Sequence, residues 1–192
     1  MNTIFGQNLF GAAAYLSAVF TILTFVTGIL FFTVGKPFGK INDISSVFQV
    51  MLMLPLAYFF LPVTSPGLWG LGLAAALIGL AGMLVSAYGQ GLLVFNRIDF
   101  ETSQKFFPAG GLIGVWLALI NALALTMSAL PVTLAWIGIF AGIGYIVTVV
   151  GFLRGSQNHI LFYSGSLVLA ICYPVWAIWL GRLIFAGLVG IG

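Results

Sequence analysis

Charge is nearly absent from this chain. Its 192 residues include only six lysines and arginines and three aspartates and glutamates, so 5% of the sequence is charged while 62% is hydrophobic. An ordinary soluble domain has about 25% charged residues and is about half apolar. A soluble fold could not cover its surface with so few charges, so we expect the chain to be embedded in a membrane.

The scarcity of cysteine and of basic residues argues against further kinds of site, partner and targeting segment. The single cysteine, Cys172, excludes an internal disulfide and a cysteine-built metal site, and we expect it to be a small buried hydrophobe. The few basic residues are scattered without an aromatic-basic motif, which argues against a nucleic-acid partner. No charge precedes Lys36, so we expect no cleavable signal peptide.

Long hydrophobic runs dominate what remains. A bilayer core of about 30 Å needs about 20 apolar residues per helix. Continuous runs favour helices over the alternating strands of a barrel. The sequence therefore predicts an all-α integral membrane protein, a compact single-domain bundle of six transmembrane helices. The spans fall at about residues 10–34, 43–61, 68–95, 111–130, 132–153 and 160–180, and the break at Pro131 is the weakest because it carries no polar residue.

The charges indicate an orientation. With six spans, the first, third and fifth connections hold Lys36, Lys40, Arg97, Lys105 and Arg154, while the second and fourth hold no charge. Short loops rich in lysine and arginine stay cytoplasmic, so both termini are expected on the extracytoplasmic side, in a bacterial inner (plasma) membrane. Trp69, Trp136, Trp176 and Trp179 then fall near the outer interface, where an aromatic belt is expected.

Small residues recur at helical spacing on several spans. The stripe on the third span consists of Gly72, Ala75, Gly79, Gly82, Ser86 and Gly89. Spacings of three and four keep these residues on one face, and in lipid small residues let helices approach closely. We expect each stripe to face a neighbouring helix. A homo-oligomer seam, or a face that admits a flat apolar ligand, is the alternative.

Polar side chains at depth are the candidate ligand-binding residues. Asp43, Ser46 and Gln49 recur at steps of three where the second span enters the membrane, although Asn42 or Asp43 could also cap that helix. Such a stripe indicates either interhelical hydrogen bonds or a lined inner vestibule. Gln90 and Asn121 are further candidates. Because an amide in hydrocarbon needs a partner, each is expected either to form an interhelical hydrogen bond or to contact a ligand in the vestibule.

Only one constellation resembles a catalytic site. His159, the single histidine, opens the sixth span, with Tyr163 four residues later and Asp43 on the same side of the membrane. A His–Asp pair can do acid–base work, but a lone loop histidine also serves as an ordinary interfacial residue. One histidine with one or two acids is too little for a metal site, and the residues indicate no particular cofactor. The loop 96–110 is expected to lie in the membrane interface.

Three functions fit these observations. The favoured one is a non-catalytic bundle that binds an apolar or lipid-like molecule, or that acts as an accessory subunit beside a membrane-protein partner or a second copy. The first alternative is a small transporter or channel that uses Asp43, Ser46, Gln49, Gln90 and Asn121. The second is an intramembrane enzyme acting on a lipid or isoprenoid through His159, Asp43 and Tyr163.

Overall fold

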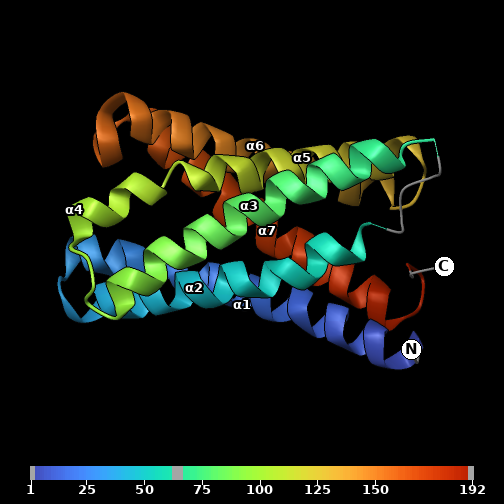
Figure 1. Cartoon of the computed structure of the whole chain (residues 1–192), viewed down its shortest axis with the longest axis horizontal. Coiled ribbons are helices and arrows are strands. Elements are labelled where there is room, and N and C mark those ends of the chain that lie inside the picture. Colours follow the sequence, from blue (N-terminus) through green and yellow to red (C-terminus); the bar gives the residue numbers. More distant parts are fainter. Residues whose placement is uncertain (1–2, 62–66, 190–192) are drawn as a thin grey trace.

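Helices make up nearly all of this protein. The computed structural model describes residues 3–61 and 67–189, and these contain no strand. Six helices are long and apolar enough to cross a membrane, and they run along the long axis of the molecule (Figure 1). They are α1 (Thr3–Thr33), α2 (Pro37–Phe59), α3 (Trp69–Val94), α5 (Ala109–Thr126), α6 (Val132–Gly155) and α7 (Ile160–Phe185). The short elements are α4 (Phe100–Ser103), η1 (Gln104–Phe106) and η2 (Ser156–Asn158).

Three of the long helices end in the same left-handed turn. Asn96, Ser128 and Gly187, each the second residue past a helix end, have φ angles of 52°, 52° and 67°. Backbone hydrogen bonds of 2.8–3.0 Å close these turns, from Arg97 to Leu92, from Ala129 to Ala124 and from Leu188 to Leu183. They satisfy carbonyl groups that the helix leaves free. The turn at Ser128 separates α5 from α6, so the break predicted before Pro131 is confirmed.

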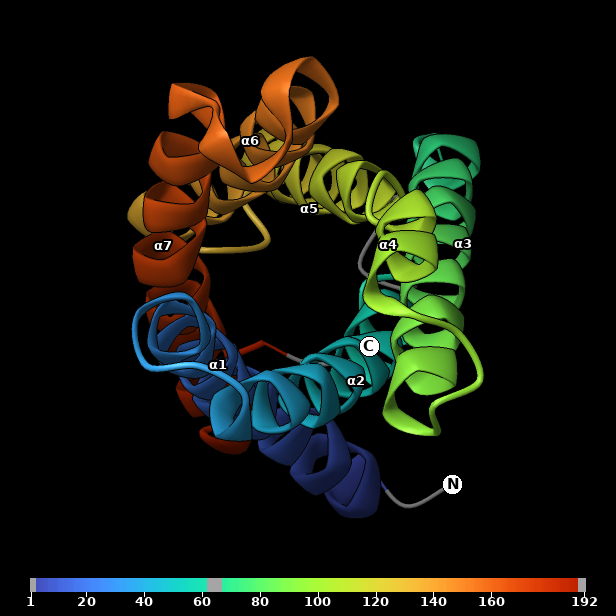
Figure 2. The ribbon, with the colours of Figure 1, turned by 90° about the vertical axis from the view of Figure 1, so that its left-hand side faces the viewer.

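The long helices form a closed ring. Each packs against two neighbours in the order α1, α2, α3, α5, α6, α7 and back to α1, as the end-on view shows (Figure 2). Large side chains fill the interior, and Met53, Trp116, Tyr173 and Trp176 are fully buried. The connections after α1, α3 and α6 lie at one end, here called the charged end (Figure 1). The start of α1 and the end of α7 lie at the opposite end, here called the terminal end.

Glycines set the separation of neighbouring helices. A Cβ on Gly142 of α6 would lie 2.6 Å from the carbonyl oxygen of Gly114 in α5, and a Cβ on Gly114 would lie 2.7 Å from that of Gly142. Because these obstacles are backbone atoms, a side chain would force the helices apart. In α3, Gly79 lies directly against Trp116 of α5. The small-residue stripe of α3 therefore faces a helix of the same bundle, as its spacing predicts.

Two local predictions are wrong. The helix α2 begins at Pro37 with Lys36 as its N-cap, so neither Asn42 nor Asp43 caps it. Proline suits the first helical position because its φ is already helical and the position needs no N–H. Trp176 does not belong to an aromatic belt, because it is fully buried in the ring interior. Its polar atom finds a partner there, as described below.

Candidate functional site

The polar stripe on α2, formed by Asp43, Ser46 and Gln49, has a different environment at each of its three residues. Gln49 is buried, and its Nε2 donates a hydrogen bond to the hydroxyl of Tyr145 in α6 at 2.8 Å. Since α2 and α6 are not adjacent in the ring, this bond crosses the interior. Ser46 donates to the carbonyl of Asn42 in its own helix at 2.8 Å. Asp43 is half-exposed, and its side-chain carboxylate has no hydrogen bond or ion pair with the residues that the structure describes.

Asn121 is fully buried and its amide joins three helices. Its Nδ2 donates to the carbonyl of Leu117 at 2.8 Å, and its Oδ1 accepts a hydrogen bond from the indole Nε1 of Trp176 in α7 at 2.8 Å. The amide lies against Gly138 of α6, where any side chain would collide with it. This geometry favours interhelical hydrogen bonding over ligand contact as the role of Asn121.

Gln90 lies apart from Asn121. It is half-buried about one turn from the charged end of α3, whereas Asn121 lies in the half of α5 nearer the terminal end. The Oε1 of Gln90 is buried and has no hydrogen-bond partner within the described ranges, as is also true of Thr24 Oγ1 and Trp116 Nε1. The five predicted ligand-binding residues form no hydrogen bonds with one another in that part of the chain. No hydrogen bond among the described residues therefore links these five into one site, and their role in ligand binding stays a prediction.

The partners of the buried polar groups were not predicted from the sequence. Besides Tyr145 and Trp176, these include a fully buried pair in which the hydroxyl of Tyr173 in α7 donates to Ser17 Oγ in α1 at 2.9 Å. The available signal was the presence of tyrosine and tryptophan within apolar spans, because their polar atoms usually find partners when buried. That signal gives no indication of which helix supplies the partner.

The three catalytic candidates have separate surroundings. His159 is the N-cap of α7, and its Nδ1 accepts a hydrogen bond from the backbone N–H of Leu161 at 3.2 Å. Tyr163 is 57% exposed on the outer surface, with its ring against Phe162. Neither forms a hydrogen bond or ion pair with Asp43 among the described residues. Within residues 3–61 and 67–189, no three histidine, cysteine or acidic side chains gather as a metal would require.

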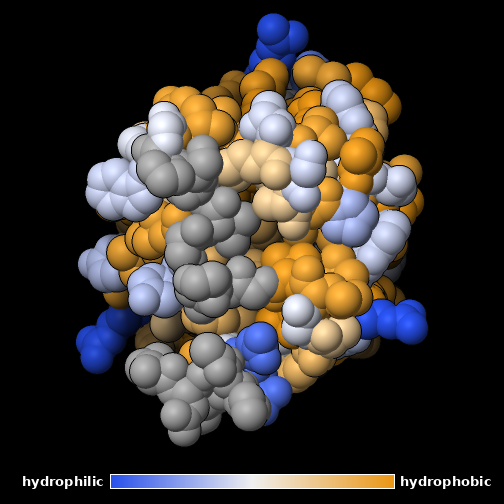
Figure 3. Space-filling view, turned by 90° about the vertical axis from the view of Figure 1, so that its right-hand side faces the viewer, coloured by the Kyte–Doolittle hydropathy of each residue, from blue (hydrophilic) through white to orange (hydrophobic). Residues whose placement is uncertain are grey.

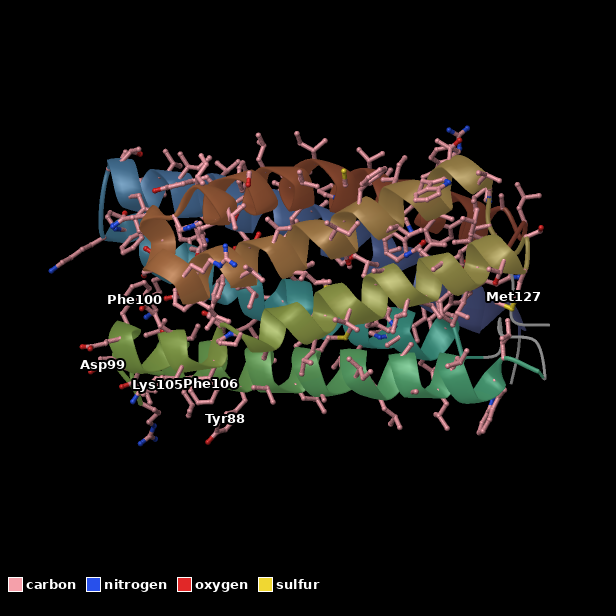
Figure 4. The ribbon with its side chains drawn as sticks, turned by 90° about the horizontal axis from the view of Figure 1, so that it is seen from above. Tyr88, Asp99, Phe100, Lys105, Phe106 and Met127 are labelled. Atoms are coloured by element: carbon pink, nitrogen blue, oxygen red, sulfur yellow. The ribbon has the colours of Figure 1, made fainter. Side chains whose placement is uncertain are left out.

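The segment between α3 and α5 is fastened to α3 at the charged end. Asp99 caps α4 by accepting a hydrogen bond from the N–H of Thr102 at 2.7 Å, and hydrogen bonding from Thr102 lowers the pKa of Asp99. The ring of Phe106 packs edge-on against Tyr88, 5.9 Å between centroids. Figure 4 shows Tyr88, Asp99 and Phe106 together, far from Met127 at the other end. The ring contact holds η1 against α3, and Phe100 of α4 remains 44% exposed.

An apolar groove of about 590 Å³ opens on the outer face of α7 at the terminal end. Val175, Ile178 and Trp179 line it from the helix, and Ala186 and Leu188 line it from the segment beyond. Arg182 supplies its one charge. A smaller hollow of about 90 Å³ lies between α6 and α7. Neither is lined by the five predicted ligand-binding residues.

The wall of this groove is exposed. Figure 3 views the molecule from the terminal end, where the coloured residues are a mixture of hydrophobic ones, paler ones of intermediate hydropathy and a few strongly hydrophilic ones. Val175 is 46% exposed and Ile178 is 42% exposed, so the groove wall faces outward from the ring. A ligand could reach it from the surrounding lipid without entering the bundle.

Replacement of Asn121 by leucine is expected to destabilise the bundle, because the indole N–H of Trp176 would be buried without an acceptor. The expected loss is about 1–3 kcal/mol, measured by reversible unfolding in mixed detergent micelles. The double variant Asn121→Leu/Trp176→Phe removes the unpaired donor. Its loss of stability should be smaller than the sum of the losses in Asn121→Leu and Trp176→Phe by about 0.6 kcal/mol or more, a coupling typical of such bonds in membranes. Strictly additive losses would contradict the pairing.

Replacement of His159 by alanine is expected to cost about 0.5–2 kcal/mol, because α7 loses its N-cap. His159→Ser should restore most of this stability, since a serine oxygen can accept the same backbone N–H. Tyr163→Phe is the matched control and should leave the melting temperature unchanged. Equal melting temperatures for the wild type and His159→Ala would show that the cap contributes nothing.

Comparisons with known proteins add no assignment to this geometry. No protein-family model, curated protein or solved structure matches the chain. Its function is therefore inferred from its own residues.

Proposed function

We propose that this chain is a non-catalytic multi-pass membrane protein that binds an apolar or lipid-like molecule on its outer surface. The observation that carries the proposal is the apolar groove on α7. It lies outside a ring whose interior amides on Gln49 and Asn121 are already bound to Tyr145 and Trp176. A ligand on the outside leaves these bonds intact.

The alternatives gain less support from the same contacts. A transporter usually places ionisable residues near the midplane, whereas Asp43 lies in the second turn of α2, near the charged end. An enzyme built on His159 would have to release it from the cap of α7. Docking of a membrane-protein partner or of a second copy would use the same outer surface, and the lipid experiment below detects it as added protein mass.

We further propose that the charged end faces the cytoplasm of a bacterial cell and that both termini face the extracytoplasmic side. All connections with lysine or arginine lie at the charged end, as expected if they stay cytoplasmic. The polar and charged residues of α4 and η1, including Lys105, would then lie at the inner interface beside lipid phosphate.

The orientation can be tested with single cysteines in a Cys172→Ala background. Lys36→Cys at the charged end should react with a membrane-impermeant maleimide only after the cells are lysed, because the cytoplasm is closed to the reagent. Ser128→Cys, in the connection at the terminal end, should react in intact cells. Both native side chains are exposed. The reverse labelling pattern would contradict the proposed orientation.

Lipid binding can be tested by native mass spectrometry of protein purified in a mild detergent. The wild type should retain bound lipid through a delipidating wash, because the groove shields part of the lipid from detergent. Ile178→Trp, which fills the groove, should reduce the retained fraction several-fold. Ile171→Trp is the matched control, since Ile171 is also exposed on α7, at 57%, but does not line the groove.

The proposal fails if the wild type carries no lipid after purification in several mild detergents. It also fails if Ile178→Trp and Ile171→Trp retain as much lipid as the wild type. A second copy or another protein bound in place of lipid, and removed by Ile178→Trp, would replace lipid binding by the accessory role.

A further inference from the structure

Among the described residues, Arg182 is the one charged side chain at the terminal end of the bundle. The other eight charged residues lie in the charged-end connections or in the adjoining turns of the helices. Arg182 occupies the last turn of α7, is exposed, and has no ion pair among the described residues. It also lines the groove, whose other walls are apolar. A permanently charged group beside apolar surface at the edge of the bilayer is a strong point of attraction for an anion.

The groove and the arginine make complementary demands on a ligand. A guanidinium group binds phosphate through two parallel hydrogen bonds, whereas Val175 and Ile178 offer only apolar contact. The groove follows α7, so its length is aligned with lipid chains in a bilayer that the helix crosses. Its volume of about 590 Å³ falls within the range of about 300–1,000 Å³ usual for ligand pockets. A free phosphate would use only the arginine, and a hydrocarbon would use only the groove.

We infer that the groove is a site for one anionic diacyl phospholipid, whose phosphate binds Arg182 while an acyl chain lies along Val175 and Ile178. Trp179, which also lines the groove, is suited to the boundary between headgroup and chain. This inference rests on the proposed function and specifies its ligand. It assigns Arg182 a role in recognition that the proposed function alone does not require.

A purely structural role for Arg182 makes a different prediction. A cation in the last turn of a helix offsets the negative end of the helix dipole, and a long stem lets the charge reach the headgroup region. Lysine satisfies both requirements as well as arginine does. Recognition of phosphate through a planar fork requires arginine, so Arg182→Lys separates the two roles.

The test measures the occupancy of two lipids with identical chains, phosphatidylglycerol and diacylglycerol, which lacks the phosphate, by native mass spectrometry of the full chain in detergent. The wild type should favour phosphatidylglycerol by about tenfold, the scale of one or two charge-assisted hydrogen bonds. Arg182→Gln should abolish this preference, and Arg182→Lys should restore only part of it. Arg154→Gln, the exposed arginine at the other end of the bundle, is the matched control and should behave as the wild type.

The remaining outcomes separate this inference from the proposed function. If Arg182→Gln or Arg182→Lys keeps the full preference, headgroup recognition by Arg182 is overturned, while lipid retention that depends on Ile178 still supports the proposed function. Equal occupancy of both lipids in the wild type would also overturn headgroup recognition by Arg182 and leave the proposed function standing. If the wild type retains neither lipid, both proposals fail. Unchanged melting temperatures of the Arg182 variants show that a lost preference reflects binding rather than unfolding.

Discussion

Burial in an apolar ring constrains this structure more than any other condition, because a polar side chain that faces inward costs free energy unless it finds a partner within the protein. The bonds Gln49–Tyr145 and Asn121–Trp176, with that of Tyr173 to Ser17, meet this need and each joins different helices. Among the described residues, α3 is the one long helix without an interhelical hydrogen bond. It is held by close packing instead, with Gly79, Gly82 and Gly89 against α5 and η1.

Close packing and polar pairing depend on each other. The side chain of Asn121 has room only because Gly138 carries none, and Thr148 approaches α7 closely where Gly165 lacks a side chain. Thr148 also satisfies its own hydroxyl by donating to the carbonyl of Gly144 at 2.8 Å. Small residues bring backbones together without a hydrophobic driving force, and the resulting short distances let polar atoms on different helices meet. Substitution at a glycine would therefore disturb hydrogen bonds that the glycine itself does not form.

The sequence predicts the helices of this fold well and their partners poorly, for a physical reason. Hydrophobic runs, the break before Pro131 and the glycine stripe of α3 are local patterns, and the structure contains all of them. The partner of Gln49 depends on which helices face each other across the ring, which no local pattern records. Trp176 shows the same limit, since a tryptophan near a span end fits both a lipid belt and a buried hydrogen bond. The sequence likewise identifies the polar residues within the spans. It does not indicate that Gln90 lies near the charged end while Asn121 lies nearer the terminal end.

The contrast between interior and exterior indicates where binding costs least free energy. A ligand inside the ring would have to displace large buried side chains such as Tyr173 and break paired amides, at about 0.6 kcal/mol or more for each such bond in a membrane. A ligand on α7 displaces only lipid or detergent from an apolar wall and gives an anion to Arg182, which has no ion pair within residues 3–61 and 67–189. Arg182 and the groove wall belong to α7 and the segment directly after it, so this part of the chain itself fixes their separation. The interior hydrogen bonds of Tyr173 and Trp176 hold α7 in the ring, and they keep outward the face on which we propose that a ligand binds.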